Sequence, residues 1–366
     1  MRLPQIFHSL HKRLQRMFEK SSEGGESATP SIQDIAGRLA EEQQRLRQLE
    51  ATTMPKERTL LVLGSKCVGK TTAINKFFDR EEHATRPTLA LEYSFGRRIG
   101  SGKTPQVMNV WELGSLDNAE QLLEVPIKTH GLQQLAVFIM LDLSQPQRFW
   151  TDLECVYKGL RDTAHQMMQK LTPDLREILE QRTTERVGQQ SKENLEPLPF
   201  PVVIVGGKYD IFSSFDPAIK KHTCRCLRSM AHLIGGALLF YSHRMPKLAK
   251  VLRDTISHMG FGSPAHPFRS HVEDFNEPLC IWFGTDSWSK IGDTGVQSVE
   301  RIGATFGVEV PQLQLEKQKL QETSDPAKDP GFKESLIDEM RSQKNEELAG
   351  LMRDALLRGK FESVQN

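Results

Sequence analysis

The chain has 366 residues, enough for one large or two small domains with a packed core. Lys and Arg together number 48 and Asp and Glu 47, so the formal net charge is only +1. That balance excludes the strong positive field of a typical nucleic-acid-binding protein, and we expect no nucleic-acid partner.

The longest apolar run, residues 135–143, is much shorter than the roughly 20 residues that cross a bilayer. We therefore expect no transmembrane segment. The five cysteines show no disulfide framework, and their odd number favours a reducing compartment. Cys224 and Cys226 have no matching metal ligands nearby in the sequence, so we expect no zinc site.

Residues 1–50 are expected to form a basic and amphipathic helical extension with a linker. Residues 1–20 place apolar side chains on one helical face and contain a single acid, Glu19. This pattern resembles a transit peptide or a membrane-surface helix, but we favour a terminal helix that frays or packs on a partner. Residues 21–30 are a Ser/Gly linker, and Ser31 is a suitable N-cap for a second amphipathic helix over 32–49.

The most informative stretch is 60–72, LLVLGSKCVGKTT, which contains the complete phosphate-loop pattern G-x-x-x-x-G-K-[ST]. An apolar strand precedes the pattern and a helix follows it, as the motif requires. Its N–H groups would cradle phosphates, Lys70 would reach the β- and γ-phosphates, and Thr71 would offer its hydroxyl to Mg²⁺. The candidate nucleotide-binding residues here are Gly64, Ser65, Lys66, Cys67, Val68, Gly69, Lys70, Thr71 and Thr72.

Residues 51–260 are predicted to form one α/β domain. Strands are expected at 59–63, 89–95, 107–113, 136–141, 202–205 and 237–241, and helices at 72–78, 150–171, 174–186, 219–234 and 246–259. Strands that alternate with helices throughout indicate a doubly wound, small-GTPase-like P-loop domain with helical extensions at both ends. The ligand of such a fold lies at the carboxyl edge of its sheet.

Residues 261–312 are predicted to be an irregular extension packed on the domain, with one further strand at 278–284. Residues 313–366 form a tail dense in charge of both signs. Apolar residues recur at steps of three and four between Ile337 and Ala355. Two interpretations of this tail stay open, a solvated disordered segment and a helix that orders on a partner.

Hydrolysis of GTP needs more than a phosphate loop. Thr88 follows the first helix of the domain, so Thr71 and Thr88 are the candidate Mg²⁺ ligands. The third strand ends WELGS at 111–115, which lacks an Asp-x-x-Gly turn and a water-orienting Gln and offers only a Glu. Lys66 and Cys67 stand where small residues are usual, which crowds the γ-phosphate and the attacking water.

Guanine recognition is preserved in part. Lys208 and Asp210 keep two positions of an Asn-Lys-x-Asp motif, whereas Gly207 replaces the Asn. Asp210 could accept hydrogen bonds from the guanine ring or cap the next turn. We expect a site that holds GTP or GDP with Mg²⁺, or no ligand, and that does not turn GTP over efficiently.

Several motifs together resemble the dynein light intermediate chains. The most specific is TLALEY at 88–93 followed by GRR at 96–98, which ordinary GTPases do not share. The resemblance covers roughly residues 35–347 and leaves the first twenty residues unexplained. Its other matching stretches are 64–72, 111–114, 141–146, 199–202, 207–210, 286–288 and 325–330.

The resemblance, which is strongest to the cytoplasmic dynein 2 branch, implies a non-catalytic GTPase-like scaffold. It implies that the chain binds and stabilises the dynein-2 heavy chain beside other dynein-2 subunits and the intraflagellar transport machinery. It also implies a role in cilium assembly and retrograde transport, in the cytoplasm, cilium, ciliary base, axoneme and centrosome region. A slow GTPase switch is the alternative. From the apolar stripes we expect the partner surface at 32–49 and beyond 313.

Overall fold

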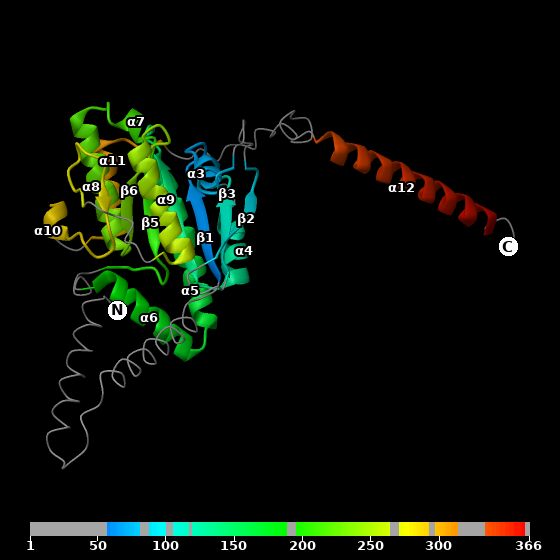
Figure 1. Ribbon diagram of the computed structural model, residues 1–366, viewed down its shortest axis with the longest axis horizontal. Helices are drawn as coiled ribbons and strands as arrows, with labels where there is room; N and C mark the ends of the chain where they lie inside the picture. Colours follow the sequence, from blue (N-terminus) through cyan, green and yellow to red (C-terminus); the bar gives the residue numbers. More distant parts are fainter. Residues whose placement is uncertain are drawn as a thin grey trace, which may run out of the picture. The chain divides into compact units, whose positions relative to one another are not determined.

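The structure is a computed structural model that describes residues 57–80, 88–99, 105–116, 119–188, 195–263, 271–292, 297–313 and 334–362 (Figure 1). The described residues belong to one unit, Lys56–Asn366. The predictions for residues 1–50 and 325–330 lie outside the described residues. The strands are β1 (Glu57–Gly64), β2 (Leu91–Ile99), β3 (Pro105–Leu113), β4 (Leu135–Asp142), β5 (Val202–Gly207), β6 (Ala237–Phe240) and β7 (Cys280–Ile281).

The helices of the described part follow the expected positions in the first 260 residues, with additions. They are α3 (Lys70–Phe77), α4 (Ala119–His130), α5 (Phe149–Lys170), α6 (Pro173–Val187), α7 (Tyr209–Phe212), α8 (Pro217–Leu233), α9 (Pro246–Phe261), α10 (Trp288–Ile291), α11 (Val299–Glu309) and α12 (Ser335–Glu362). Helix α4, which carries Pro126 in its interior, was not predicted from the sequence. Among the described residues, none of these helices is both long enough and apolar enough to cross a membrane.

The strands form one seven-stranded sheet in the order β2-β3-β1-β4-β5-β6-β7. Neighbouring strands from β3 to β6 are parallel, which confirms the doubly wound α/β prediction. The two edge strands differ, because β2 pairs with β3 and β7 pairs with β6 in antiparallel fashion. The expectation that strands alternate with helices throughout is therefore wrong at β2 and β3, which follow one another without a helix between them.

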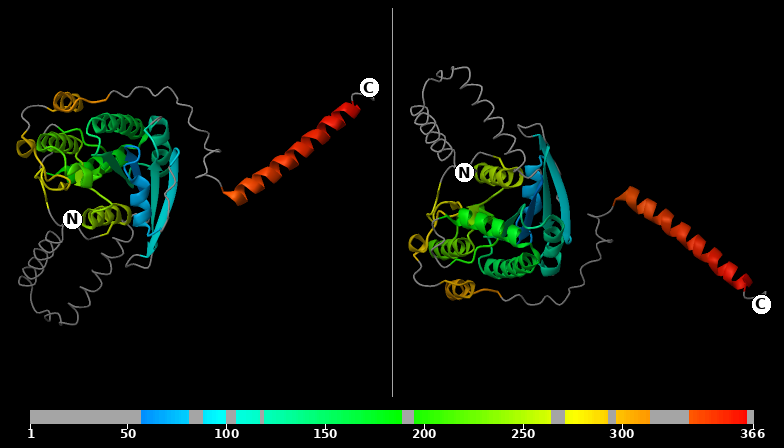
Figure 2. Two further views of the ribbon diagram at one scale, coloured as in Figure 1. Left: turned by 90° about the horizontal axis from the view of Figure 1, so that it is seen from above. Right: turned by 90° about the horizontal axis from the view of Figure 1, so that it is seen from below.

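Helices cover both faces of the sheet, as both views of Figure 2 show. The two-residue period of a strand explains how β1 contributes to both sides. Leu61 and Leu63 belong to the core beneath α4, α5 and α8, whereas Leu60 and Val62 belong to the core beneath α3 and α9. Because every one of these side chains is buried, β1 holds the phosphate loop on a rigid base.

The segment expected to be an irregular extension contains β7 and two short helices, α10 and α11. The ring of Phe306 on α11 lies 4.8 Å from the ring of Phe149 on α5. Just after α11, Gln312 Nε2 donates to the carbonyl of Pro146 at 3.0 Å, and the Leu313 N–H donates to the carbonyl of Gln147 at 2.8 Å. These contacts attach the chain, as far as residue 313, to α5 and to the loop between β4 and α5.

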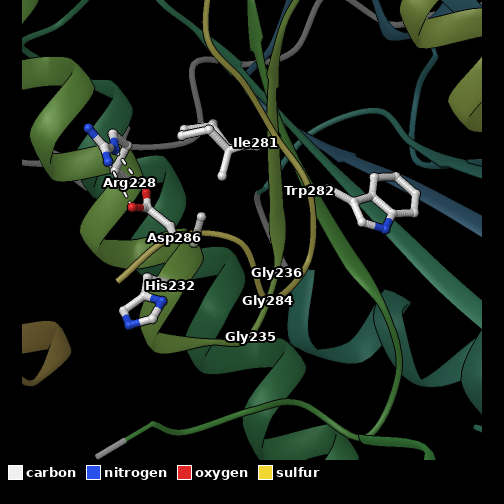
Figure 3. Close-up of a pocket in the computed structure, with 10 residues that line it drawn as sticks. Arg228, His232, Gly235, Gly236, Ile281, Trp282, Gly284 and Asp286 are labelled. Carbon is white, nitrogen blue, oxygen red and sulfur yellow. Dashed lines mark hydrogen bonds and ion pairs between the residues drawn. The ribbon is translucent and has the colours of Figure 1, made fainter. Parts of the chain in front are cut away.

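An ion pair joins the segment before α10 to α8 (Figure 3). Arg228 Nε donates to Asp286 Oδ2 at 2.8 Å, and Arg228 Nη2 donates to Asp286 Oδ1 at 2.7 Å. Arg228 Nη2 also lies 3.3 Å from Glu273 Oε2. Arg228 and Asp286 are buried beside a cavity of about 10 Å³ that His232 and Ile281 also line. The ion pair therefore joins α8 to the segment before α10 inside the protein, and the chain itself supplies these partners of Arg228.

Candidate nucleotide-binding site

The phosphate loop begins where β1 ends against β4. Gly64 has a φ of 130°, and a Cβ there would lie 1.9 Å from the carbonyl oxygen of Met140, so only glycine fits. The next residue, Ser65, donates its N–H to that same carbonyl at 2.9 Å. The loop ends at Gly69, whose φ is 100° and which immediately precedes α3. The strand–loop–helix context that the motif requires is therefore present.

Lys70 is the first residue of α3 and is almost fully buried, with 4% of its surface exposed. Its Nζ donates to the carbonyls of Ser65 at 2.9 Å, Gly64 at 3.3 Å and Gly114 at 3.4 Å. An ammonium group has three donors, and all three are occupied here. Burial lowers the pKa of Lys70, and the nearby Glu112 carboxylate opposes that shift.

The side chains expected on the metal side of the loop lie together. Thr71 Oγ1 is 3.4 Å from Thr88 Oγ1 and donates to Glu112 Oε1 at 2.6 Å. Thr88 Oγ1 donates to Glu92 Oε2 at 3.2 Å. Glu112 is buried, which raises the pKa of its carboxyl group, while the Thr71 hydroxyl and Lys70 oppose the rise. In the sequence, Glu112 stands out only as the one acid near the expected turn.

Ser65 connects the loop to the end of β4. The backbone N–H of Asp142 donates to Ser65 Oγ at 3.2 Å. A second acid, Asp152 on α5, is also buried in this region, and burial raises the pKa of its carboxyl group against a hydrogen bond from Ser65. Neither acid was predicted from the sequence as a site residue. Asp142 was findable as the polar end of an apolar strand, whereas no local signal marks Asp152.

The candidate base-recognition residues are engaged by the chain's own side chains. Lys208 Nζ lies 2.6 Å from Asp142 Oδ2, and Asp210 Oδ1 accepts a hydrogen bond from Ser242 Oγ at 2.6 Å. Arg244 Nη1 lies 3.5 Å from the other Asp210 oxygen. The structure thus connects Lys208 to the loop through Asp142 and Ser65, and it places Asp210 in the first turn of α7.

Gly207 stands at the expected Asn position, and there is no space for a side chain there. A Cβ at 207 would lie 2.5 Å from Cγ2 of Val68, a buried residue of the phosphate loop. Two other loop residues, Lys66 and Cys67, are exposed, and Cys67 has a left-handed φ of 59°. Thr72 is half-buried in the first turn of α3.

The residues present fit a nucleotide phosphate chain with a divalent cation. The loop offers a helix start and a lysine for phosphate, and Thr71, Thr88, Glu92 and Glu112 offer the hard oxygen donors that Mg²⁺ prefers. Bound Mg²⁺ would neutralise charge on phosphate oxygens. Among the described residues, no group of three or more His, Cys, Asp and Glu side chains forms a cluster suited to a metal ion. The assignment of individual residues to nucleotide or metal remains a prediction.

A mostly parallel sheet with a phosphate loop at its carboxyl edge defines a P-loop GTPase-like domain. The sequence model of the family described as dynein light intermediate chain matches residues 39–200. Cytoplasmic dynein 2 light intermediate chain 1 of Danio rerio is 35% identical over 319 residues, covering 82% of this chain and 86% of that protein. The human protein of the same name is 33% identical over 307 residues, covering 80% and 86%. The chain therefore belongs to the dynein light intermediate chain family.

A solved structure is similar in fold. The crystal structure of the dynein light intermediate chain's conserved domain aligns with a TM-score of 0.50 at 16% identity, covering 71% of this chain and 92% of that chain. This agreement concerns the fold alone. It confirms that the family resemblance seen in the motifs extends to the arrangement of the sheet and helices.

Proposed function

We propose that this chain is a non-catalytic subunit of cytoplasmic dynein 2 that binds and stabilises the motor's heavy chain. The observation that carries the proposal is the 33–35% identity, over about four-fifths of the chain, to proteins named cytoplasmic dynein 2 light intermediate chain 1. The proposed role places the chain in the cytoplasm and at the cilium, its base, the axoneme and the centrosome region. There it would support retrograde intraflagellar transport and cilium assembly together with the transport machinery.

The features around the phosphate loop support a role without turnover. The residues that follow Gly114 are Ser115 and Leu116. The glutamine that would orient the attacking water for GTP hydrolysis is therefore missing from its expected position. A side chain at Gly207 would collide with Val68, which excludes the usual asparagine contact to a guanine base. Lys208 is paired with Asp142. A domain with these changes can retain its fold and serve as a scaffold.

The exposed face of β2 supports binding of a large protein partner. Tyr93, Phe95 and Ile99 alternate along this edge strand, and their exposed fractions are 47%, 51% and 80%. The Tyr93 ring lies 4.9 Å from that of Trp111 and 6.4 Å from that of Phe95, so the aromatic side chains form one surface. An apolar surface on an edge strand of a monomer indicates a protein interface. We assign this surface, together with segments 32–49 and 313–366, to the heavy chain.

Affinity purification from ciliated cells tests the proposal. The full chain should co-purify with the dynein-2 heavy chain, and the double variant Tyr93→Ser, Phe95→Ser should recover less of it. Val308→Ser is the matched control, because Val308 on α11 is equally apolar and 81% exposed. Full recovery of the heavy chain by the β2 variant would indicate that the interface lies at the two ends of the chain instead. Failure of the unaltered chain to recover any heavy chain would overturn the proposal.

A hydrolysis assay tests the non-catalytic part. The purified chain should hydrolyse GTP no faster than buffer with Mg²⁺. GTP turnover that Lys70→Ala abolishes would establish the alternative, a slow GTPase switch.

A further inference from the structure

The strand β2 lies at one edge of the sheet and is much longer than the strand at the other edge (Figure 1). It has 9 residues, whereas β7 has 2. Antiparallel pairing with β3 uses the N–H and C=O groups of alternate residues. The Gly114 N–H donates to the Ala90 carbonyl at 2.8 Å, so the even-numbered residues of β2 direct these groups toward β3. The odd-numbered residues direct theirs outward, where no strand of the described part pairs with them.

A long edge strand with an apolar face pairs with another chain unless prolines, bulges or charges prevent it. The strand β2 contains no proline, and its register against β3 is continuous from end to end, without a bulge. Its charged residues are Glu92, Arg97 and Arg98. These charges therefore decide which second strand the edge of β2 can accept.

The sequence of β2, LEYSFGRRI, is complementary to itself in the antiparallel direction. When two copies pair about a two-fold axis at Phe95, Glu92 of each copy is directly opposite Arg98 of the other. Opposite charges in directly opposed positions stabilise a sheet. On the other face of the sheet, Tyr93 is opposite Arg97, which favours a cation–π contact, and the two Phe95 side chains are opposite each other.

Only one register of the two strands gives these pairs. The outward backbone groups belong to odd-numbered residues, so odd-numbered residues must oppose odd-numbered residues, and the register can change only in steps of two. A shift by one step in either direction places Gly96 or Gly100 opposite Glu92 and removes the charge pair. The self-complementary pattern thus specifies the two-fold arrangement that is centred on Phe95.

The positive charges of β2 have only neutral neighbours. The Arg98 guanidinium donates to side-chain oxygens of Ser257 at 3.2 Å, Ser263 at 3.0 Å and Gln106 at 3.4 Å. The guanidinium of Arg97 lies over an aromatic ring of its own strand. Within the residues that the structure describes, neither arginine forms an ion pair with an acid. A glutamate of a second copy would supply the missing negative charge.

We propose that two copies of this chain associate through β2, in an antiparallel pair centred on Phe95 that joins their sheets into one. The two-fold symmetry uses the outer edge of β2 in both copies, and β7 is too short to continue the sheet, so association stops at the dimer. This inference concerns the chain free of the motor and does not depend on the proposed function. A heavy-chain segment that bound β2 would replace the second copy.

Sedimentation velocity of the purified full chain over a series of concentrations tests the dimer. The chain should pass from monomer to dimer and form no larger species. Arg97→Pro removes an outward N–H that β3 does not use, so the fold should persist. The variant should dimerise at least about tenfold more weakly, because the symmetry removes the hydrogen bond twice. Arg97→Gln keeps the N–H and should lose less.

Charge reversal tests the register. Arg98→Glu places two acids opposite each other, and Glu92→Arg places two arginines opposite each other, so each variant alone should remain monomeric. An equal mixture of the two variants should dimerise again, because every opposed pair then has opposite charges. Thermal melting checks that each variant is folded. These experiments contain no heavy chain, so their failure would leave the motor role untouched.

A thiol cross-link gives a measurement that does not depend on altered charge. Phe95→Cys should be joined to its symmetry mate by a short bifunctional reagent. Ile99→Cys is the control, because Ile99 is 80% exposed but the two copies of this residue would lie about 27 Å apart along the strands. The unaltered chain gives the background from its native cysteines. The proposal is overturned if the unaltered chain stays monomeric or aggregates without limit, if Arg97→Pro dimerises normally, or if both cysteine variants cross-link equally.

Discussion

Gly303 of α11 lies directly against the indole ring of Trp150 on α5, and a Cβ at position 303 would come within 2.5 Å of three ring atoms. The contact shows how closely the backbone of α11 approaches α5. We expect Gly303→Ala to destabilise the protein by about 1–3 kcal/mol, because overpacking forces side chains or backbone to shift.

Gly307, four residues along the same helix, is the control for this prediction. A Cβ there would meet no atom within 4 Å. Gly307→Ala should be neutral or should stabilise by about 0.5–1 kcal/mol through the helix preference of alanine. Urea unfolding of the two variants checks the pair. Equal stabilities would show that the close approach of Gly303 to Trp150 has no energetic consequence.

The two glycines of the phosphate loop should differ in the same way. Gly64→Ala places a methyl group 1.9 Å from the Met140 carbonyl oxygen, a backbone atom that cannot move aside. We expect this variant to lose the strand end or to fail to fold. Gly69→Ala meets no atom within 4 Å and should cost only the about 1–3 kcal/mol of an unfavourable backbone conformation. Circular dichroism and thermal melting distinguish these outcomes, and a normally stable Gly64→Ala would contradict the described turn.

The Arg228–Asp286 pair predicts a further contrast. Asp286→Asn leaves a buried guanidinium with reduced compensation and should cost about 3–5 kcal/mol. Asp79→Asn breaks an exposed pair with Arg253 and should cost no more than about 1 kcal/mol. Denaturant midpoints measured for both variants decide the matter. Similar losses in the two variants would mean that Arg228 finds enough compensation in Glu273.

The chain should lose stability in alkali. Burial raises the pKa of the Cys280 thiol from 9.0 to about 11 and that of the Cys224 thiol from 9.0 to about 12. Above pH 9 the unfolded chain therefore releases protons that the folded chain retains. The free energy of unfolding is at its full value below pH 9 and falls between pH 9 and about 12. Each thiol contributes on the order of 3 kcal/mol to this loss, because one pKa unit corresponds to about 1.4 kcal/mol.

Urea midpoints at a series of pH values measure this effect, with Cys280→Ala as the comparison. The variant should be less stable than the unaltered chain at pH 7, because it loses packing, but its stability should decline less steeply in alkali. The expectation fails if both proteins follow parallel pH profiles. Buried Tyr241, with a pKa raised from 10.0 to about 12, adds to the decline in both.

The parts of the site that local sequence determines could be predicted. The loop from Gly64 to Thr71 follows from one motif between a strand and a helix, and the structure shows that context. The pairing of β2 with β3 could not be predicted in the same way. Residues of β2 are exposed at alternate positions, and the sequence indicated only that the segment is extended. Its direction relative to β3 is fixed by the pairing of the two strands, which the sequence does not reveal.

The acids around the loop illustrate a second limit. Glu92 and Glu112 become neighbours only through the register of β2 against β3, and twenty residues separate them in the chain. Asp152 reaches the loop from α5 because the helix packs across the sheet. In the same way, the two short helices after β7 depend on contacts such as that of Phe306 with Phe149. The positions of these acids and helices depend on packing against elements that are distant in the sequence, and the local pattern of apolar residues does not indicate them.

The attachment of residues 312 and 313 to the loop after β4 has a mechanical consequence. A pull on the chain beyond residue 313 would first stretch the hydrogen bonds that residues 312 and 313 make with this region, among them those from Leu313 to Gln147 and from Gln312 to Pro146. Both acceptors lie just before α5, the helix that brings Asp152 to the phosphate loop. Tension on the tail would thus enter the domain beside its phosphate loop. In an optical trap, the first extension step should occur at a lower force when Gln312 is replaced by alanine, because only the bonds of Leu313 then hold the segment.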